Sequence, residues 1–154
     1  MIKIEVFSEE KAWSKKLKKK ELFFKKICNF FPRKYRFPNK KITLSLLLSN
    51  NKCIKKLNKN FRNKNKSTDI LSFPLEKKTS ITKSTYIGDI IISYNFMNKP
   101  RSQNIKSFKE KVIKTFIHSN PTSKSIVSWS RADKEQLAGK ITFEDGKILI
   151  STKE

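Results

Sequence analysis

Cysteine and long hydrophobic runs are both scarce in this chain of 154 residues. The two cysteines, Cys28 and Cys53, form no close CxxC pair, so nothing indicates the disulfide framework of a secreted protein. The longest apolar stretch, residues 42–48, is far shorter than the roughly 20 residues that a membrane-spanning helix needs. The first ten residues contain no basic segment followed by an apolar one, so we identify no signal peptide. We therefore expect a soluble, cytoplasmic protein.

Acidic residues are also few, since 13 Asp and Glu stand against 36 Lys and Arg and the formal net charge is +23 at pH 7. A surface this basic attracts polyanions, and the phosphate backbone of RNA is the partner we expect. Arginine supplies only five of the basic residues, while Ala and Gly number three each. A chain so rich in Lys, Asn and Ile is also typical of an AT-rich coding sequence. Mutational bias therefore remains an alternative source of part of the charge.

Apolar residues recur with clear periods, and 12 Phe supply large side chains for the core of one domain. Alternating or continuous apolar runs predict four strands, over residues 2–6, 41–48, 69–73 and 86–93. Helical spacing predicts a helix from Ser8 to Phe31, a short one ending near Phe61, and one over residues 105–118. We expect an α+β fold in which a small mixed four-stranded sheet packs with about three helices.

The character of the chain changes at His118. Residues 1–118 hold 30 basic and 8 acidic side chains, whereas residues 119–154 hold 6 and 5. Within this last segment, residues 141–150 form two alternating runs around Asp145-Gly146, which predicts a short β-hairpin. We therefore divide the chain into a domain over residues 1–118 and an atypical tail over residues 119–154, which is too short to fold as an independent domain.

Two segments carry ordered motifs: LNKNFRNKNKSTDILSFP over residues 57–74, and IGDIIIS over residues 87–93. Together they resemble the YbeY family of endoribonucleases, which has an Asn-x-x-aromatic-Arg helix end, a polar loop, a Thr-Asp-Val-Leu-Ser-Phe-Pro strand and then Gly-Asp-Ile. The resemblance covers roughly residues 1–118. It implies a single-strand-specific, metal-dependent endoribonuclease that acts on rRNA and the ribosome, in 16S rRNA 3′-end maturation and ribosome quality control.

The resemblance also implies a zinc cofactor, held in the family by three histidines of a His-Gly-x-x-His-Leu-x-Gly-x-Asp-His run. His118 matches the first ligand, but Ser119 stands where the family has Gly, and the chain has no second histidine. Because a catalytic zinc usually has three protein ligands and one open position, we expect weak zinc binding and impaired activity. Without the resemblance, the better explanation of His118 is a histidine on the surface or at the end of a helix. Four acidic residues of the tail have no metal-site spacing: Asp133, Glu135, Glu144 and Asp145.

Arg62 matches the family's arginine beside the metal, where a guanidinium can bind a phosphate or stabilise developing charge. The alternative is an arginine that closes a helix at its negative end. Asp69 and Asp89 suggest a different site, two carboxylates that share a magnesium ion. The structural explanation for both is a carboxylate at a strand entrance that accepts hydrogen bonds from loop amides.

A second hypothesis for the whole chain keeps the scaffold and the positive surface but not the chemistry. It is a non-catalytic RNA- or ribosome-binding protein. Zinc content and chelator-sensitive cleavage separate it from the enzyme, because only the enzyme requires both.

Overall fold

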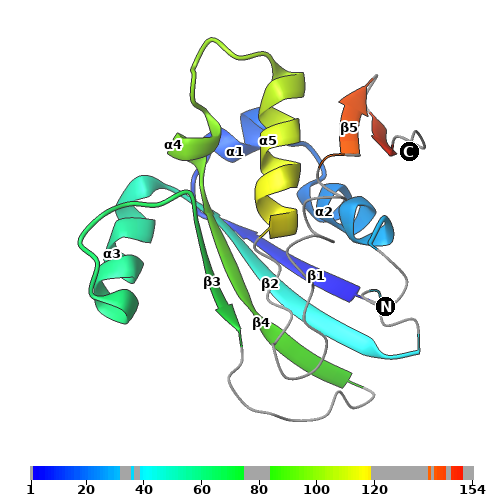
Figure 1. The fold of residues 1–154 in the computed structure, drawn as a ribbon, viewed down its shortest axis with the longest axis horizontal. Helices are drawn as coiled ribbons and strands as arrows, with labels where there is room; N and C mark the ends of the chain where they lie inside the picture. The colour runs from blue at the N-terminus through cyan, green and yellow to red at the C-terminus, as the bar shows by residue number, and fades with distance from the viewer. Residues whose placement is uncertain are drawn as a thin grey trace.

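The computed structural model of the chain describes residues 2–31, 36, 39–74, 84–118, 139, 141–144 and 147–150. Six strands lie in these ranges: β1 (Ile2–Ser8), β2 (Lys41–Ser49), β3 (Ile70–Pro74), β4 (Ser84–Ser93), β5 (Ile141–Glu144) and β6 (Lys147–Ile150). The first four form one sheet in the order β1-β2-β4-β3, in which β1, β2 and β4 are parallel and β3 is an antiparallel edge strand (Figure 1). The expected mixed four-stranded sheet is thereby confirmed.

Five helices accompany the strands in the described part of the chain: α1 (Ala12–Lys16), α2 (Lys20–Asn29), α3 (Asn51–Arg62), α4 (Tyr94–Met97) and α5 (Ile105–His118). Three of them, α2, α3 and α5, have ten residues or more, which confirms the α+β fold with about three substantial helices. None of these helices combines the length and the apolar character that crossing a bilayer requires.

The single helix predicted from Ser8 to Phe31 is wrong, because the structure has α1 and α2 in its place. The backbone is extended at Leu17, with φ −120° and ψ 114°, and left-handed at Lys19, with φ 48°. Four charged residues, 18–21, separate Leu17 from the next apolar side chain. With no apolar group to hold a continuing turn against the sheet, the chain bends and both Trp13 and Leu17 are buried.

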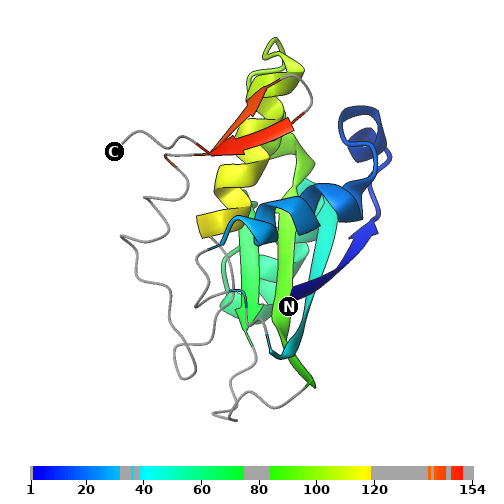
Figure 2. The same cartoon turned by 90° about the vertical axis from the view of Figure 1, so that its right-hand side faces the viewer.

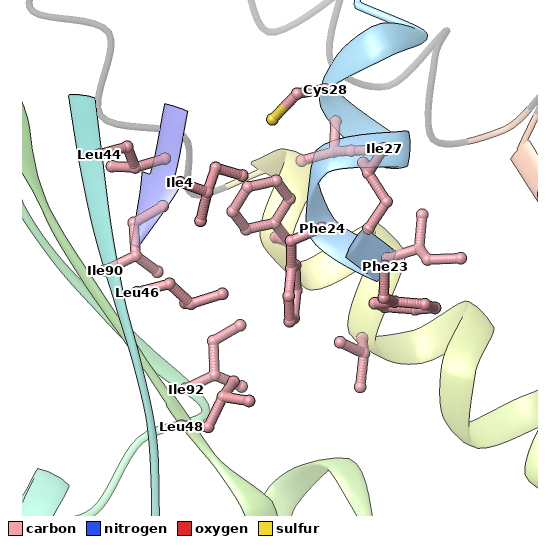
Figure 3. Packing of buried hydrophobic residues seen from close by; sticks show 14 of the residues in the cluster. Ile4, Phe23, Phe24, Ile27, Cys28, Leu44, Leu46, Leu48, Ile90 and Ile92 are labelled. Carbon is pink, nitrogen blue, oxygen red and sulfur yellow. The ribbon is translucent and has the colours of Figure 1, made fainter. Parts of the chain in front are cut away.

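The main core lies between one face of the sheet and the helices α2 and α5 (Figure 3). Alternate residues of β2 and β4 point into it, and each is fully buried or nearly so: Ile42, Leu44, Leu46, Leu48, Ile90 and Ile92. Phe24 of α2 and Phe116 of α5 meet edge to face above these strands, with ring centroids 5.1 Å apart. The opposite face carries α3 alone among the described helices, over a smaller cluster of Ile54, Leu71 and Ile91.

Trp13 connects α1 to the end of the sheet. Its side chain is fully buried, and its indole Nε1 donates a hydrogen bond of 2.9 Å to the backbone oxygen of Ser49. The ring also packs against Tyr94 and Phe108, with centroid distances of 5.5 and 5.8 Å. One side chain thus joins α1 to β2, α4 and α5.

A polar cluster fixes the start of α3. Asn50 caps the helix, since its side-chain oxygen accepts a hydrogen bond of 2.9 Å from the backbone N–H of Cys53. The Ser49 hydroxyl donates to a carboxylate oxygen of Glu9 at 2.5 Å. Hydrogen bonds from the Cys53 thiol and the Ser49 hydroxyl lower the pKa of Glu9 below its ordinary value of 4.5. The cluster therefore holds the first turn of α3 against the end of β1.

The tail contributes an antiparallel pair, β5 and β6, whose register runs from Ile141 opposite Ile150 to Glu144 opposite Lys147. This confirms the two strands of the predicted hairpin, while the turn at residues 145–146 lies outside the described residues. β5 lies beside α5, on the side of the molecule away from α3 (Figures 1 and 2).

Replacing Trp13 with Phe tests the indole hydrogen bond. The substitution keeps an aromatic ring but removes the buried N–H that donates to Ser49, so we expect the free energy of unfolding to fall by about 1–3 kcal/mol. Urea denaturation measures it. The matched control is Phe7→Leu at an exposed aromatic, expected to change stability by less than about 0.5 kcal/mol. Equal effects of the two substitutions would contradict the proposed importance of the bond.

The cluster around Glu9 predicts a pH dependence. Because the pKa of Glu9 is lowered on folding, its contribution to stability is present above about pH 4.5 and is lost as the pH falls through the lowered value. We expect Glu9→Gln, and separately Ser49→Ala, to weaken the acid sensitivity of the urea midpoint between about pH 3 and pH 5. The effect should be small, since Glu9 is exposed to solvent. A steeper acid loss in either variant would refute this assignment.

Candidate functional site

Arg62 is the last residue of α3, at the edge of the sheet. Its Nη2 donates a long hydrogen bond of 3.4 Å to the backbone oxygen of Ser72 in the edge strand β3. The helix ends there because Asn63 adopts a left-handed conformation, with φ 56°. The guanidinium is exposed and is oriented toward β3, where a phosphate approaching the sheet edge could reach it.

Asn58, the first residue of the Asn-x-x-aromatic-Arg motif, is a positioning residue that the sequence did not single out. It is 2% exposed, and its Nδ2 donates to the backbone oxygen of Lys66 at 2.9 Å. Its own carbonyl accepts from the N–H of Lys64 at 3.3 Å. These two bonds close the loop after α3 onto the helix, so Asn58 sets where Arg62 stands relative to β3. A polar residue on the apolar stripe of a helix is the signal that could have identified it.

His118 is the last residue of α5, on the other face of the sheet from α3. The residues before it, Phe116 and Ile117, are fully buried in the main core, whereas His118 is exposed. The structure therefore places Arg62 and His118 on helices that pack against opposite faces. The Arg62 guanidinium reaches toward the edge strand β3, and a site shared by Arg62 and His118 stays a prediction.

The register of the sheet separates Asp69 from Asp89. Asp69 lies just before β3, and its backbone oxygen accepts from the N–H of Ser93, whereas Asp89 pairs with Phe73. Those two positions are four residues apart along the strand, which is about 13 Å. A magnesium ion shared by these two carboxylates is therefore contradicted. Asp69 does stand at a strand entrance, where its side chain accepts from the Thr68 hydroxyl at 3.1 Å.

Asp89 lies inside β4 and not at its entrance, which corrects the structural explanation given for it above. The pairing of β4 with β2 passes from Tyr86 opposite Thr43 to Gly88 opposite Leu44, so Ile87 is an extra residue. Gly88 has φ 144°, a conformation that L side chains rarely adopt. The irregularity brings Tyr86 and Asp89 to the same face, where the tyrosine hydroxyl donates to the carboxylate. Partial burial raises the pKa of Asp89.

The donors available for a metal do not fit a three-histidine site. In the ranges that the structure describes, no three His, Cys, Asp or Glu side chains lie close enough together to hold a metal ion. His118 is the only histidine of the whole sequence. Asp133, Glu135 and Asp145 lie outside the described residues, and the side chain of Glu144 is not described either.

Comparison with known proteins identifies the scaffold. The family model described as Endoribonuclease YbeY matches residues 5–120. Endoribonuclease YbeY of Pelagibacter ubique is 64% identical over 118 residues, which cover 77% of each chain. Endoribonuclease YbeY of Ehrlichia canis is 37% identical over 106 residues, which cover 68% of this chain and 66% of the relative. A solution structure of a Thermotoga maritima protein is 17% identical, with a TM-score of 0.47, and the match covers 90% of this chain and 87% of that one.

The family model covers both motif segments, residues 57–74 and 87–93, together with Arg62 and His118. Zinc-dependent hydrolysis of RNA is the chemistry of this family. The chain belongs to the YbeY family of endoribonucleases.

Proposed function

We propose that this chain acts on single-stranded rRNA in the cytoplasm, in 16S rRNA 3′-end maturation and ribosome quality control, and that its hydrolytic activity is impaired. The proposal rests on one observation. The chain belongs to a zinc-dependent family but contains a single histidine, His118, where the family pattern has three zinc ligands. One imidazole cannot fix a catalytic zinc, which usually needs three protein ligands and one open position.

Binding of RNA depends on features that the chain retains. Its net charge of +23 gives a strong attraction for a phosphate backbone. Arg62, exposed beside the edge strand β3, supplies a fork of N–H donors that suits a phosphate. We assign Arg62 to binding of the RNA backbone and His118 to the position of the first family ligand.

A non-catalytic protein that binds RNA or the ribosome is the alternative function. The same pair of observations favours it, because the positive surface is kept while the histidines are not. In that case the YbeY scaffold only binds RNA or the ribosome. The expected experimental result is ribosome binding without RNA cleavage.

Zinc analysis and cleavage assays of the purified chain distinguish the two functions. Even the outer hydrogen-bonding partners of a metal site are worth about 10–100-fold in activity or affinity, so the loss of two ligands should cost more than about 100-fold. We expect well under one zinc per chain by elemental analysis, and cleavage of single-stranded RNA more than about 100-fold slower than by the Pelagibacter ubique relative. Stoichiometric zinc with chelator-sensitive cleavage at a comparable rate would refute the impairment.

Substitution of Arg62 tests its assignment to the RNA backbone. We expect Arg62→Ala to weaken RNA binding and to lower the slope of log affinity against log salt by about one, because one phosphate contact is lost. Fluorescence anisotropy at several salt concentrations measures both quantities. Arg101→Ala, at an exposed arginine between α4 and α5, is the control. If Arg62→Ala alters the unfolding midpoint but not the salt slope, the helix-closing explanation holds instead.

A further inference from the structure

A groove of about 560 Å³ lies on the face of the sheet that carries α3, opposite the face of α5 and His118. Its walls come from α3 on one side, with Leu57 and Phe61, and from β1 on the other, with Phe7. Ser45 of β2 and Asp89 of β4 are the polar side chains of its lining. The groove belongs to none of the positions assigned above to hydrolysis.

Large aromatic rings are exposed at this groove. Phe61 is 69% exposed and Phe7 is 55% exposed, although most large apolar side chains among the described residues are buried. Phe61 meets Phe73 edge to face, with ring centroids 5.5 Å apart and an interplanar angle of 66°. That contact holds the Phe61 ring in place while it stays open to solvent, so less conformational freedom is lost when a flat ligand stacks on it.

Positive charge adjoins the exposed rings. Arg62 and Lys64 are exposed and follow Phe61 directly, whereas Lys52, Lys56 and Lys59 are exposed on the opposite side of α3. Residues 51–66, which comprise α3 and the loop after it, contain seven basic residues and no acidic one. A polyanion therefore complements this rim better than a neutral or basic protein surface does.

The lining beneath the rings suits a nucleobase better than a phosphate. The Asp89 carboxyl would repel a phosphate but can accept hydrogen bonds from the amino group of a base. The Ser45 hydroxyl can donate or accept. Apolar walls, exposed aromatic rings and adjacent cations are the combination that proteins use to bind single strands, with bases stacked on rings and the backbone on lysines.

We propose that this groove binds an unpaired base of single-stranded RNA, stacked on Phe61, with the neighbouring phosphates on the basic residues that follow Phe61, Arg62 and Lys64. This is a second contact with RNA, on the face of the sheet opposite His118. It requires only that RNA is a ligand of the chain, and it is independent of whether the chain cleaves RNA. A duplex cannot use the groove, because its bases are already paired and stacked.

Binding of a fluorescent 12-nucleotide single-stranded RNA and of the matching 12-base-pair RNA duplex, with the full chain, tests the proposal. Phe61→Ala and Phe61→Leu should each weaken binding of the single strand by about tenfold, since a stacked base is lost. Binding of the duplex and the salt slope should stay unchanged. Phe61→Trp should retain binding, and its added fluorescence should be quenched by the single strand. Ile105→Ala, at an exposed apolar residue at the start of α5, should change none of these values.

The outcomes separate this proposal from the proposed function. Unchanged single-strand affinity in Phe61→Ala and Phe61→Leu would overturn the groove and leave RNA binding intact, whereas a wild-type chain that binds no RNA would overturn both. Loss of self-association or of ribosome cosedimentation in Phe61→Ala, with RNA affinity unchanged, would make the groove a protein-docking surface and refute the proposal. Thermal unfolding confirms that each variant is folded, and Phe61→Leu keeps most of the apolar contact with Phe73 if Phe61→Ala does not fold.

Discussion

The hydrogen bond from the indole of Trp13 to the carbonyl of Ser49 is the constraint on which the arrangement of the sheet and α3 depends. It joins α1, which follows β1, to the last residue of β2, at the end where these two parallel strands finish. At the same edge, the Ser93 hydroxyl donates to the side-chain oxygen of Asn51 at 2.6 Å. Because α3 begins at this edge, these bonds hold its first turn against the ends of the strands, and Phe61 and Arg62 lie at the other end of the helix.

The two faces of the sheet have different characters. One face is closed by α2 and α5, with a dry core of aromatic and aliphatic side chains that ends at His118. The other is only partly covered in the described structure, and there α3 presents cations and Phe61 beside a groove. The RNA contacts proposed for α3 therefore lie on a different face from His118. A chain with one histidine and a strongly basic surface is consistent with that separation.

The sequence predicted the strands well because buried parallel strands leave long apolar runs, as in β2, and because alternation marks β1. It failed between Leu17 and Lys20, where the helical spacing of the apolar residues continues across the charged residues 18–21, although the backbone bends there. It also could not separate Asp69 from Asp89, since strand register depends on pairing between distant segments. The motifs indicated Arg62 and His118, and their roles stay predictions. The groove was missed because Phe61 fits the apolar stripe of α3 and periodicity does not reveal how far the sheet extends beneath it.

The extra residue in β4 has a consequence for how the chain tolerates change in length. In a regular strand, one added or deleted residue would turn every following side chain to the opposite face. Here the irregularity at Gly88 accommodates one extra residue before Asp89. The alternation of side chains before Gly88 therefore does not determine the face on which Asp89 lies. A change in the length of the chain before Gly88 can therefore be taken up at this irregularity without reversing the inner half of the strand.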